Sequence, residues 1–425
     1  MTARDLTIPL TDAALPGLER ATAPARLGHW LGEATGHEVR VVPRRLRYKP
    51  GVSLVMSIDV LPADAPDGDA ATRHCLLRAY ASGAGAKLRK TVSATPDSVL
   101  AYDAHESLLI TTAAGDRDLP LLARLQAPDG LRQVVDRVLP DRPELGSACV
   151  RTLRHNPERR WVGLLETGGR PAVLLRGYRS KEVRDRFRAY SALEGGTPRT
   201  PAVLGWSRSY GVVAVEWVPG RELAACAARE DWLAGGATLG RLHDRTDVSL
   251  HHRSGKHQAD GVLEAAELVA RLLPGSADSV MGLARDVEDR IRHIEHERSP
   301  VHGDFSPDQV IVSDDGGTAL VDLDRAHRGD PAADLGCAVA DVMTEAEESG
   351  DVGRGRHLSA SLVEGYATAR RPPTSTTIAT YALAYRIRKA AEPFRACRPD
   401  WPALVAARVQ RAEAARELLS GGSWG

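Results

Sequence analysis

Three side chains with oxygen donors, Asp304, Gln309 and Asp322, stand close together in the sequence. A carboxylate such as that of Asp304 can orient a hydroxyl group and accept its proton. Mg²⁺ binds a few hard oxygen ligands together with water and phosphate oxygens, and the side chains of Gln309 and Asp322 offer such oxygens. Asp324 is a further candidate ligand, because it shares a face with Asp322 if both lie on one strand. Side chains of these types can serve as a general base and as ligands of Mg²⁺.

A β-hairpin is the element that must position these side chains. Segments 310–313 and 318–324 have strand composition, and Asp314-Asp-Gly-Gly317 between them is typical of a solvated turn. Pairing of the two strands would bring Gln309, at the start of the first, close to Asp322, near the end of the second. The loop that begins with His302-Gly303 and carries Asp304 would lead into this hairpin.

The order of base, amide and carboxylate resembles the layout of protein kinases, in which an Asp takes the hydroxyl proton and an Asn and an Asp hold magnesium. Over about residues 148 to 420 the chain resembles the aminoglycoside phosphotransferase and choline-kinase-like family of small-molecule kinases. The segments that carry this resemblance are His302-Gly-Asp304, Val321-Asp322, Gly329-Asp-Pro-Ala-Ala-Asp-Leu335, Leu239-Gly-Arg-Leu-His243 and Glu216-Trp-Val-Pro-Gly220.

The resemblance implies an α+β, bilobal protein-kinase-like fold in which ATP binds at the hinge and its γ-phosphate is transferred to a hydroxyl. It implies that Asp304 is the base and that Mg²⁺ and ATP are required. The other residues to which it assigns roles are Gln309, Asp322 and Asp324 as metal ligands, Glu216, Trp217 and Val218 at the adenine, and Arg176 at a phosphate.

Two of these positions depart from the family pattern. Gln309 stands where the family usually has Asn, which is similar to maltokinases and related actinobacterial sugar kinases that carry an extra N-terminal cap domain. Arg176 stands where the family has a phosphate-binding Lys, and its fork can bind phosphate bidentately. The Glu that should pair with it is not clear, since Arg186 is near the expected position and Glu182 lies one turn earlier.

An imperfect internal repeat supports the expectation of a cap. Three segments recur in the same order at offsets of about 100 residues. They are 46–50 with 153–157, 76–82 with 174–180, and 108–119 with 212–223. The repeat predicts that a cap domain, residues 1–140, resembles a degenerate nucleotide lobe, followed by a kinase-like N-lobe at 141–218 and a mostly helical C-lobe at 219–425.

Helical periodicity and turn residues predict the remaining elements. The predicted helices span 181–193, 232–243, 262–273, 280–296, 337–346, 356–370, 375–397 and 402–419, and the polar segment 251–261 is predicted to be an exposed loop. The acidic run 345–348 is typical of a solvated helix end, although it could bind a sugar amine if it faced the cleft. His293 and His296 are interpreted as a surface pair.

The composition excludes several other classes of protein. The 425 residues contain 56 basic and 56 acidic side chains, so no nucleic-acid partner is expected. No membrane span or signal peptide is recognised, and the five cysteines are widely spaced, so a cytoplasmic location is predicted. The oligomeric state cannot be predicted.

The resulting hypothesis is a kinase whose acceptor is a small polyhydroxylated metabolite, most simply a sugar or amino-sugar. An aminoglycoside or other antibiotic-inactivating O-phosphotransferase is the alternative within enzymes, because only the acceptor differs. A non-catalytic nucleotide-binding regulatory module is the alternative of another class, suggested by the departures at Gln309 and Arg176 and by the missing Glu.

Overall fold

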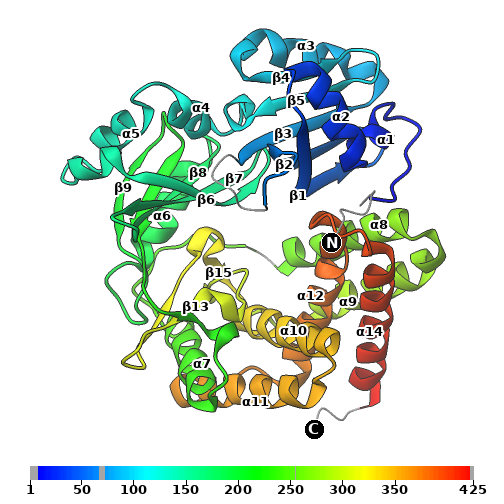
Figure 1. Ribbon diagram of the computed structural model, residues 1–425. Helices are drawn as coiled ribbons and strands as arrows, with labels where there is room; N and C mark the ends of the chain where they lie inside the picture. The colour runs from blue at the N-terminus through cyan, green and yellow to red at the C-terminus, as the bar shows by residue number, and fades with distance from the viewer. Residues whose placement is uncertain (1–7, 67–71, 254, 422–425) are drawn as a thin grey trace. The chain divides into compact units, whose positions relative to one another are not determined.

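The structure is a computed structural model that describes residues 8–66, 72–253 and 255–421 (Figure 1). The chain forms two compact units. Unit 1 contains Met1–Arg184, Leu204–Val215 and Glu392–Trp401, and unit 2 contains Asp185–Val203, Glu216–Ala391 and Pro402–Gly425. No helix in the described ranges has the length and apolar character needed to cross a bilayer.

Two five-stranded sheets with the same strand order, β1-β2-β3-β5-β4 and β6-β7-β8-β10-β9, form most of unit 1. The strands of the first sheet are β1 (Val39–Lys49), β2 (Ser53–Pro62), β3 (Arg73–Tyr80), β4 (Val99–Asp103) and β5 (Leu108–Thr112). Those of the second are β6 (Cys149–Asn156), β7 (Arg160–Thr167), β8 (Arg170–Tyr178), β9 (Val203–Ser207) and β10 (Val212–Glu216). A helix follows the third strand of each: α3 (Gly85–Ala94) and α6 (Val183–Leu193).

The strand registers also repeat. Val55 pairs with Arg47 and Arg78 in the first sheet, and Val162 pairs with Arg154 and Arg176 in the second. These are the residues that the sequence matches equate, so the predicted repeat is confirmed.

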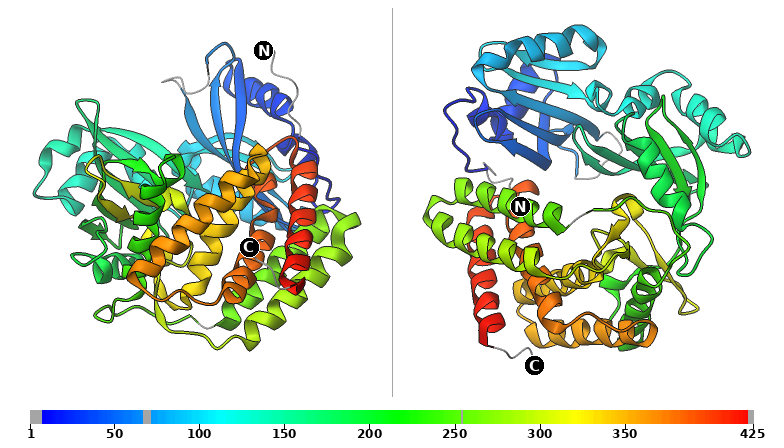
Figure 2. Two further views of the ribbon diagram at one scale, coloured as in Figure 1. Left: turned by 90° about the horizontal axis from the view of Figure 1, so that it is seen from below. Right: turned by 180° about the vertical axis from the view of Figure 1, so that it is seen from behind.

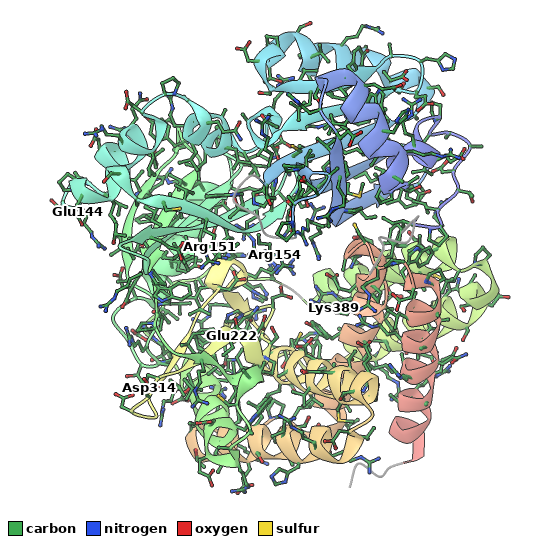
Figure 3. All side chains as sticks on the ribbon, in the orientation of Figure 1. Glu144, Arg151, Arg154, Glu222, Asp314 and Lys389 are labelled. Atoms are coloured by element: carbon green, nitrogen blue, oxygen red, sulfur yellow. The ribbon has the colours of Figure 1, made fainter. Side chains whose placement is uncertain are left out.

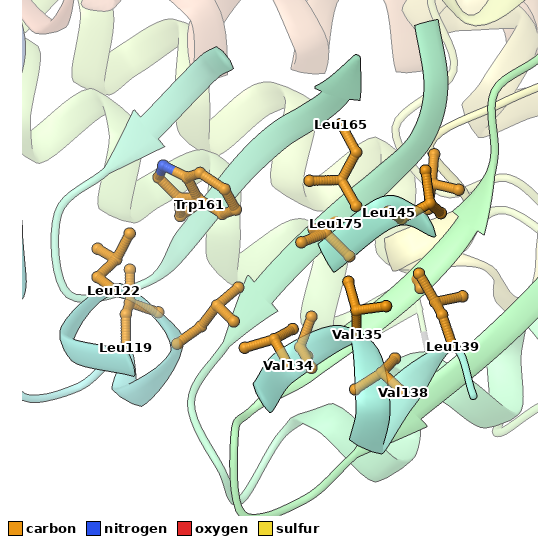
Figure 4. Packing of buried hydrophobic residues seen from close by; sticks show 14 of the residues in the cluster. Leu119, Leu122, Val134, Val135, Val138, Leu139, Leu145, Trp161, Leu165 and Leu175 are labelled. Carbon is orange, nitrogen blue, oxygen red and sulfur yellow. The ribbon is translucent and has the colours of Figure 1, made fainter. Parts of the chain in front are cut away.

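Short helices complete unit 1. Helices α1 (Leu18–Ala21) and α2 (Pro24–Thr35) precede the first sheet, and α4 (Pro120–Gln126) and α5 (Gly130–Val138) pack on the second. Figure 4 shows this packing, in which Val134 and Val138 lie with Leu165 and Leu175 in one buried cluster. Burial of these apolar side chains fixes α4 and α5 on the sheet.

Unit 2 is mostly helical (Figure 2). Its helices are α7 (Arg229–His243), α8 (Gly255–Leu272), α9 (Ala277–His293), α10 (Pro331–Ser349), α11 (Val352–Ala369), α12 (Ser375–Ala390) and α14 (Trp401–Gly421). Helices α7 and α11, α8 and α9, and α10 and α12 pack in pairs. The short strands β11 (Arg221–Glu222), β13 (Val310–Val312) and β14 (Thr318–Leu320) form one sheet, and β12 (Ser299–Val301) pairs with β15 (His327–Gly329).

Two predicted elements are wrong. The segment 251–261 is not all loop, because α8 begins at Gly255. The predicted helix 375–397 ends at Ala390, and the short helix α13 (Glu392–Arg395) that follows belongs to unit 1. Pro393 lacks the N–H that a continuous helix would donate to the Lys389 carbonyl, and that carbonyl accepts instead from Arg408 Nη1 at 3.0 Å.

Candidate active site

One buried carboxylate, that of Asp334 on α10, fixes the loop that carries Asp304. The Asp334 oxygens accept hydrogen bonds from the backbone N–H groups of His302, at 2.6 Å, and Gly303, at 2.9 Å. The ring of His243, at the end of α7, donates from Nε2 to the same carboxylate at 3.1 Å. Three hydrogen bonds to the Asp334 carboxylate therefore fix the position of the start of this loop.

The protonation of this buried pair follows from its surroundings. Burial alone would raise the pKa of Asp334, but hydrogen bonds from His243 and Gly303 outweigh it and the pKa is lowered. Burial lowers the pKa of His243, so its ring is neutral, with Nε2–H donating to Asp334 and Nδ1 accepting from the Tyr366 hydroxyl at 3.0 Å. The ionised carboxylate can then accept from both loop amides.

Gly303 is required at its position in the loop. Its φ of +84° is in the region that favours glycine, and a Cβ would lie 2.4 Å from the Arg325 carbonyl oxygen and 2.8 Å from His327 Nδ1. The absence of a side chain at Gly303 therefore lets the loop pack directly against the segment that follows Asp322.

Asp304, the predicted base, is partly exposed, with a side-chain accessibility of 30%. Arg325 Nη1 lies 3.5 Å from Asp304 Oδ1. The carboxylate is thus reachable by a ligand while one cation holds its orientation.

The predicted hairpin is confirmed. Strands β13 and β14 pair antiparallel, and the Val321 N–H donates to the Gln309 carbonyl at 2.9 Å, which makes Gln309 a neighbour of the segment at Asp322. His302 Nε2 donates to the Val321 carbonyl at 2.8 Å and so joins the loop to the hairpin. The acidic turn at Asp314 is exposed, as expected (Figure 3).

The second strand is shorter than expected, so Asp322 and Asp324 do not share a strand face. β14 ends at Leu320, Asp322 adopts a left-handed φ of +60°, and Leu323–Arg325 form a 3₁₀ turn. Asp324 is buried within that turn, and its carbonyl accepts from Arg186 Nη1 on α6.

The side chain of Gln309 is directed back into its own loop. Its Oε1 accepts from the Ser306 N–H at 3.1 Å as part of a capping box around the 3₁₀ turn Pro307–Gln309. An amide oxygen has two lone pairs, so this bond fixes the oxygen without using all of its acceptor capacity.

Of the residues predicted to contact nucleotide, Arg176 belongs to unit 1 and the others to unit 2. Arg176 is buried in β8, where its Nε donates to the Tyr178 hydroxyl at 3.0 Å. The Glu216 carboxylate accepts from Arg199 Nη2 at 2.8 Å and from the Ala202 N–H at 3.2 Å. Trp217 is partly buried and Val218 is buried.

The other polar candidates have structural partners. Glu347 in the acidic run forms a bidentate pair with Arg386 at 2.8 and 3.0 Å, and Glu348 pairs with Arg408 at 2.7 Å. His293 is exposed beside Asp289, but His296 is partly buried and contacts Asp330 and the Tyr381 hydroxyl, so the two do not form the predicted surface pair. Within the described ranges, no group of three or more His, Cys, Asp or Glu side chains is arranged to hold a metal.

The sequence reasoning missed the anchoring roles of Asp334, His243 and Tyr366. Two of them lie in segments that it had singled out, 239–243 and 329–335, but no role was assigned to either. The signal for Asp334 was a carboxylate in a small-residue, helix-forming segment, where a buried charge needs partners.

The model of the phosphotransferase enzyme family, APH, matches residues 158–372 of the chain, and the chain belongs to this family. It is therefore a phosphotransferase. The predicted family and the α+β, kinase-like fold class are thereby confirmed.

Several solved structures are similar to this chain. Choline kinase LicA from Streptococcus pneumoniae is 14% identical, with 68% of this chain and 98% of that chain covered and a TM-score of 0.47. Aminoglycoside phosphotransferase APH(3'')-Id from Streptomyces rimosus is 21% identical, with 58% and 95% covered and a TM-score of 0.45. The comparison with curated proteins gives no match.

Proposed function

We propose that this phosphotransferase is a Mg²⁺-dependent kinase that transfers the γ-phosphate of ATP to a hydroxyl of a sugar or amino-sugar. The observation that carries the proposal is the fixed loop, which holds the partly exposed carboxylate of Asp304 next to the hairpin of Gln309 and Asp322. The likeness of Gln309 to the residue in maltokinase-like sugar kinases favours a sugar among the possible acceptors.

Asp304 is the general base in this proposal. Its carboxylate accepts a hydrogen bond from the acceptor hydroxyl and takes the proton as the hydroxyl oxygen bonds to the γ-phosphorus. The bond from that phosphorus to the oxygen bridging to the β-phosphate breaks, and ADP leaves with the electron pair. Arg325 orients Asp304 and balances its charge.

Gln309, Asp322 and Asp324 are the proposed ligands of Mg²⁺. An amide and two carboxylates are a donor set that suits Mg²⁺, which completes its shell with water and phosphate oxygens. The bond from Ser306 to Gln309 Oε1 orients the amide for this role. When bound, the ion would neutralise charge on the phosphates.

Arg176 is proposed to bind a phosphate of ATP, and Glu216, Trp217 and Val218 to border the adenine. The Glu216 carboxylate is bound to Arg199 and Ala202. In this proposal the adenine is therefore contacted by backbone groups of residues 216–218 and not by that carboxylate. We also propose a cytoplasmic location, where ATP is available, and no nucleic-acid partner.

The test is a coupled assay of ATP consumption with a panel of sugars, amino-sugars and aminoglycosides. Asp304→Asn keeps the shape of the side chain but cannot accept the proton, so kcat should fall by at least about 100-fold with nucleotide affinity retained. Asp315→Asn, on the exposed turn, is the control that should leave kcat unchanged.

Other outcomes would contradict the proposal in distinct ways. Near-normal turnover of Asp304→Asn would exclude Asp304 as the base. Phosphorylation of aminoglycosides alone would support the antibiotic-inactivating alternative. Nucleotide binding without transfer to any compound would support the non-catalytic module.

A further inference from the structure

Asp341 on α10 is a partly buried carboxylate that the reaction described above does not use. Within the described part of the chain it makes no hydrogen bond and no ion pair. Burial raises its pKa to about 6, with smaller opposing effects from nearby charges. A carboxylate left without a partner is costly to the fold, which suggests that its partner is a ligand.

Lys389 is a second charged side chain without an ion-pair partner among the described residues. It lies on α12, the helix that packs against α10 (Figure 3). Its ammonium lies 5.2 Å from the centroid of the Tyr385 ring and forms no ion pair with any described residue. Ala340, the residue before Asp341, packs with Tyr385 in one buried cluster, so the two charged groups are neighbours. The charge of Lys389 lowers the pKa of Asp341, yet no salt bridge joins the two among the described residues. The Asp341 carboxylate, a hydrogen-bond acceptor, and the Lys389 ammonium, a donor, therefore lie on two packed helices without bonding to each other.

Asp341 and Lys389 lie close to the loop that carries Asp304. Helix α10 contacts the 3₁₀ turn Pro307–Gln309, and the charge of Asp308 in that turn acts on Asp341. Tyr385 packs with Cys337 in one apolar cluster, and the charge of Asp304 reaches both of them. The loop that carries Asp304 is bonded to Asp334 on α10, and Asp341 lies about two turns further along the same helix, so Asp304, Asp341 and Lys389 belong to the same part of unit 2.

Charges of both signs lie near Asp304, since carboxylates such as Asp308 and Asp341 are accompanied by several arginines. Arg325 is 3.5 Å from Asp304, and Arg388 is adjacent to Lys389 on α12. Burial lowers the pKa of Arg253, and so does the repulsion of Arg186, Arg325 and Arg388. A strongly charged acceptor of either sign would therefore meet like charges here.

We propose that Asp341 and Lys389 bind the acceptor, and that this acceptor is an uncharged sugar whose hydroxyls bridge the two side chains. The carboxylate accepts from one hydroxyl and the ammonium donates to another, which leaves a further hydroxyl for Asp304. A sugar phosphate is disfavoured by Asp341 and Asp304, and an aminoglycoside by Lys389, Arg388 and Arg325. This inference rests on the proposed function and identifies its acceptor.

Steady-state kinetics of the full chain test the proposal with D-glucose, maltose, D-glucosamine, glucose 6-phosphate and kanamycin as acceptors. In Asp341→Asn and in Lys389→Met, KM for the best uncharged sugar should rise about 10- to 100-fold while KM for ATP stays unchanged. Glu345→Gln is the matched control, because it removes a carboxylate one turn further along α10 where the side chain is exposed, and it should leave both constants unchanged.

The outcomes that overturn this inference differ from failure of the proposed function. Unchanged KM in both variants, or preferential phosphorylation of kanamycin or glucose 6-phosphate, excludes an uncharged acceptor held by this pair. Failure of the proposed function would instead appear as no phosphate transfer to any acceptor. Thermal unfolding of both variants confirms that altered KM does not reflect a misfolded chain.

Discussion

At the scale of single residues, the position of the loop that carries Asp304 depends on one carboxylate that accepts several hydrogen bonds. Asp334 receives two adjacent backbone N–H groups and the ring of His243, and it lies on a helix that is itself in the core of unit 2. An amide in the same place would turn donor hydrogens toward one of these donors. The position therefore requires an ionised side chain and tolerates no isosteric neutral one.

Asp334→Asn should accordingly lower both stability and activity. Loss of charge-assisted hydrogen bonds to buried donors is expected to cost about 2–4 kcal/mol of the free energy of unfolding. Because the loop amides lose their acceptor, kcat should fall together with stability. Denaturant unfolding and turnover measure the two effects. Asp315→Asn, whose carboxylate also accepts from a backbone N–H but on an exposed turn, should cost less than about 1 kcal/mol, and equal costs would contradict the argument.

A second residue-scale prediction concerns pH. Asp341 has a raised pKa of about 6 because of burial, with Asp308 and Glu345 raising it and Lys389 and Arg408 lowering it. The folded state binds this proton more tightly than the unfolded chain, so the stabilising effect is complete below about pH 4 and is lost as the pH rises through about 6. Asp341→Asn should therefore be roughly 1–3 kcal/mol more stable than the natural chain at pH 8.

The check is the difference in free energy of unfolding between Asp341→Asn and the natural chain across pH. The difference should shrink as the pH falls and vanish near pH 4. A difference that stays constant with pH would mean that the carboxylate is not destabilised in the fold.

At the scale of elements, the β13–β14 hairpin shows what local sequence can and cannot predict. Its turn and apolar strands are encoded by nearby residues, so the neighbourhood of Gln309 and Asp322 was predictable. The end of β14 was not predictable, because the Val321 carbonyl accepts a hydrogen bond from the ring of His302, which is distant in sequence. The left-handed backbone at Asp322 comes directly after this contact.

The same backbone gives a way to separate metal binding from conformation. Asn tolerates a left-handed φ nearly as well as Asp, whereas Ala does not. Asp322→Asn should raise the Mg²⁺ concentration needed for half-maximal activity at least about tenfold with little change in stability, because a neutral amide is a weaker ligand than a carboxylate. Asp322→Ala should add a cost of about 1 kcal/mol in the free energy of unfolding.

Titration of activity with Mg²⁺ and denaturant unfolding distinguish the two variants. If Asp322→Asn kept the natural Mg²⁺ dependence, Asp322 would not be a ligand. A matching loss of stability in both variants would mean that the side chain has a structural role of its own.

At the scale of the whole molecule, the two sheets of unit 1 share an arginine at the position proposed to bind a phosphate in the second sheet. Arg78 occupies the position that Arg176 has in the second sheet. Its guanidinium is buried against Glu158 Oε1 at 3.3 Å and the Gly115 carbonyl at 3.0 Å. Glu158 also pairs with Arg47, so the first sheet's arginine is neutralised within the protein.

One nucleotide site per chain is therefore expected. Titration calorimetry with a non-hydrolysable ATP analogue should give a stoichiometry near one. Arg176→Met should lower the affinity at least about tenfold, because a charged phosphate contact is lost. Arg78→Met should leave the affinity unchanged and lower only stability, since Arg78 bonds to other protein groups. Two sites per chain, or equal effects of the two variants, would contradict this.

The repeat itself was predictable because each copy keeps its strand order and its paired residues. The division into units was not predictable from the sequence. Residues of α13 join unit 1 through contacts with the first sheet, where Arg45 Nη1 bonds to Glu392 Oε1 at 2.5 Å and the ring of Tyr48 packs edge-on against Phe394. A helical pattern in the sequence carries no information about such a distant partner.

The interleaving of the two units has a consequence for how the protein can be dissected. The chain passes between them at five points, after Arg184, Val203, Val215, Ala391 and Trp401. A protease that cuts at any one of these points leaves both units joined by the other crossings, so a single nick releases no autonomous fragment. Truncation before Glu392 removes part of unit 1 together with α14 of unit 2. Shortened versions of the gene should therefore fail to yield either unit alone.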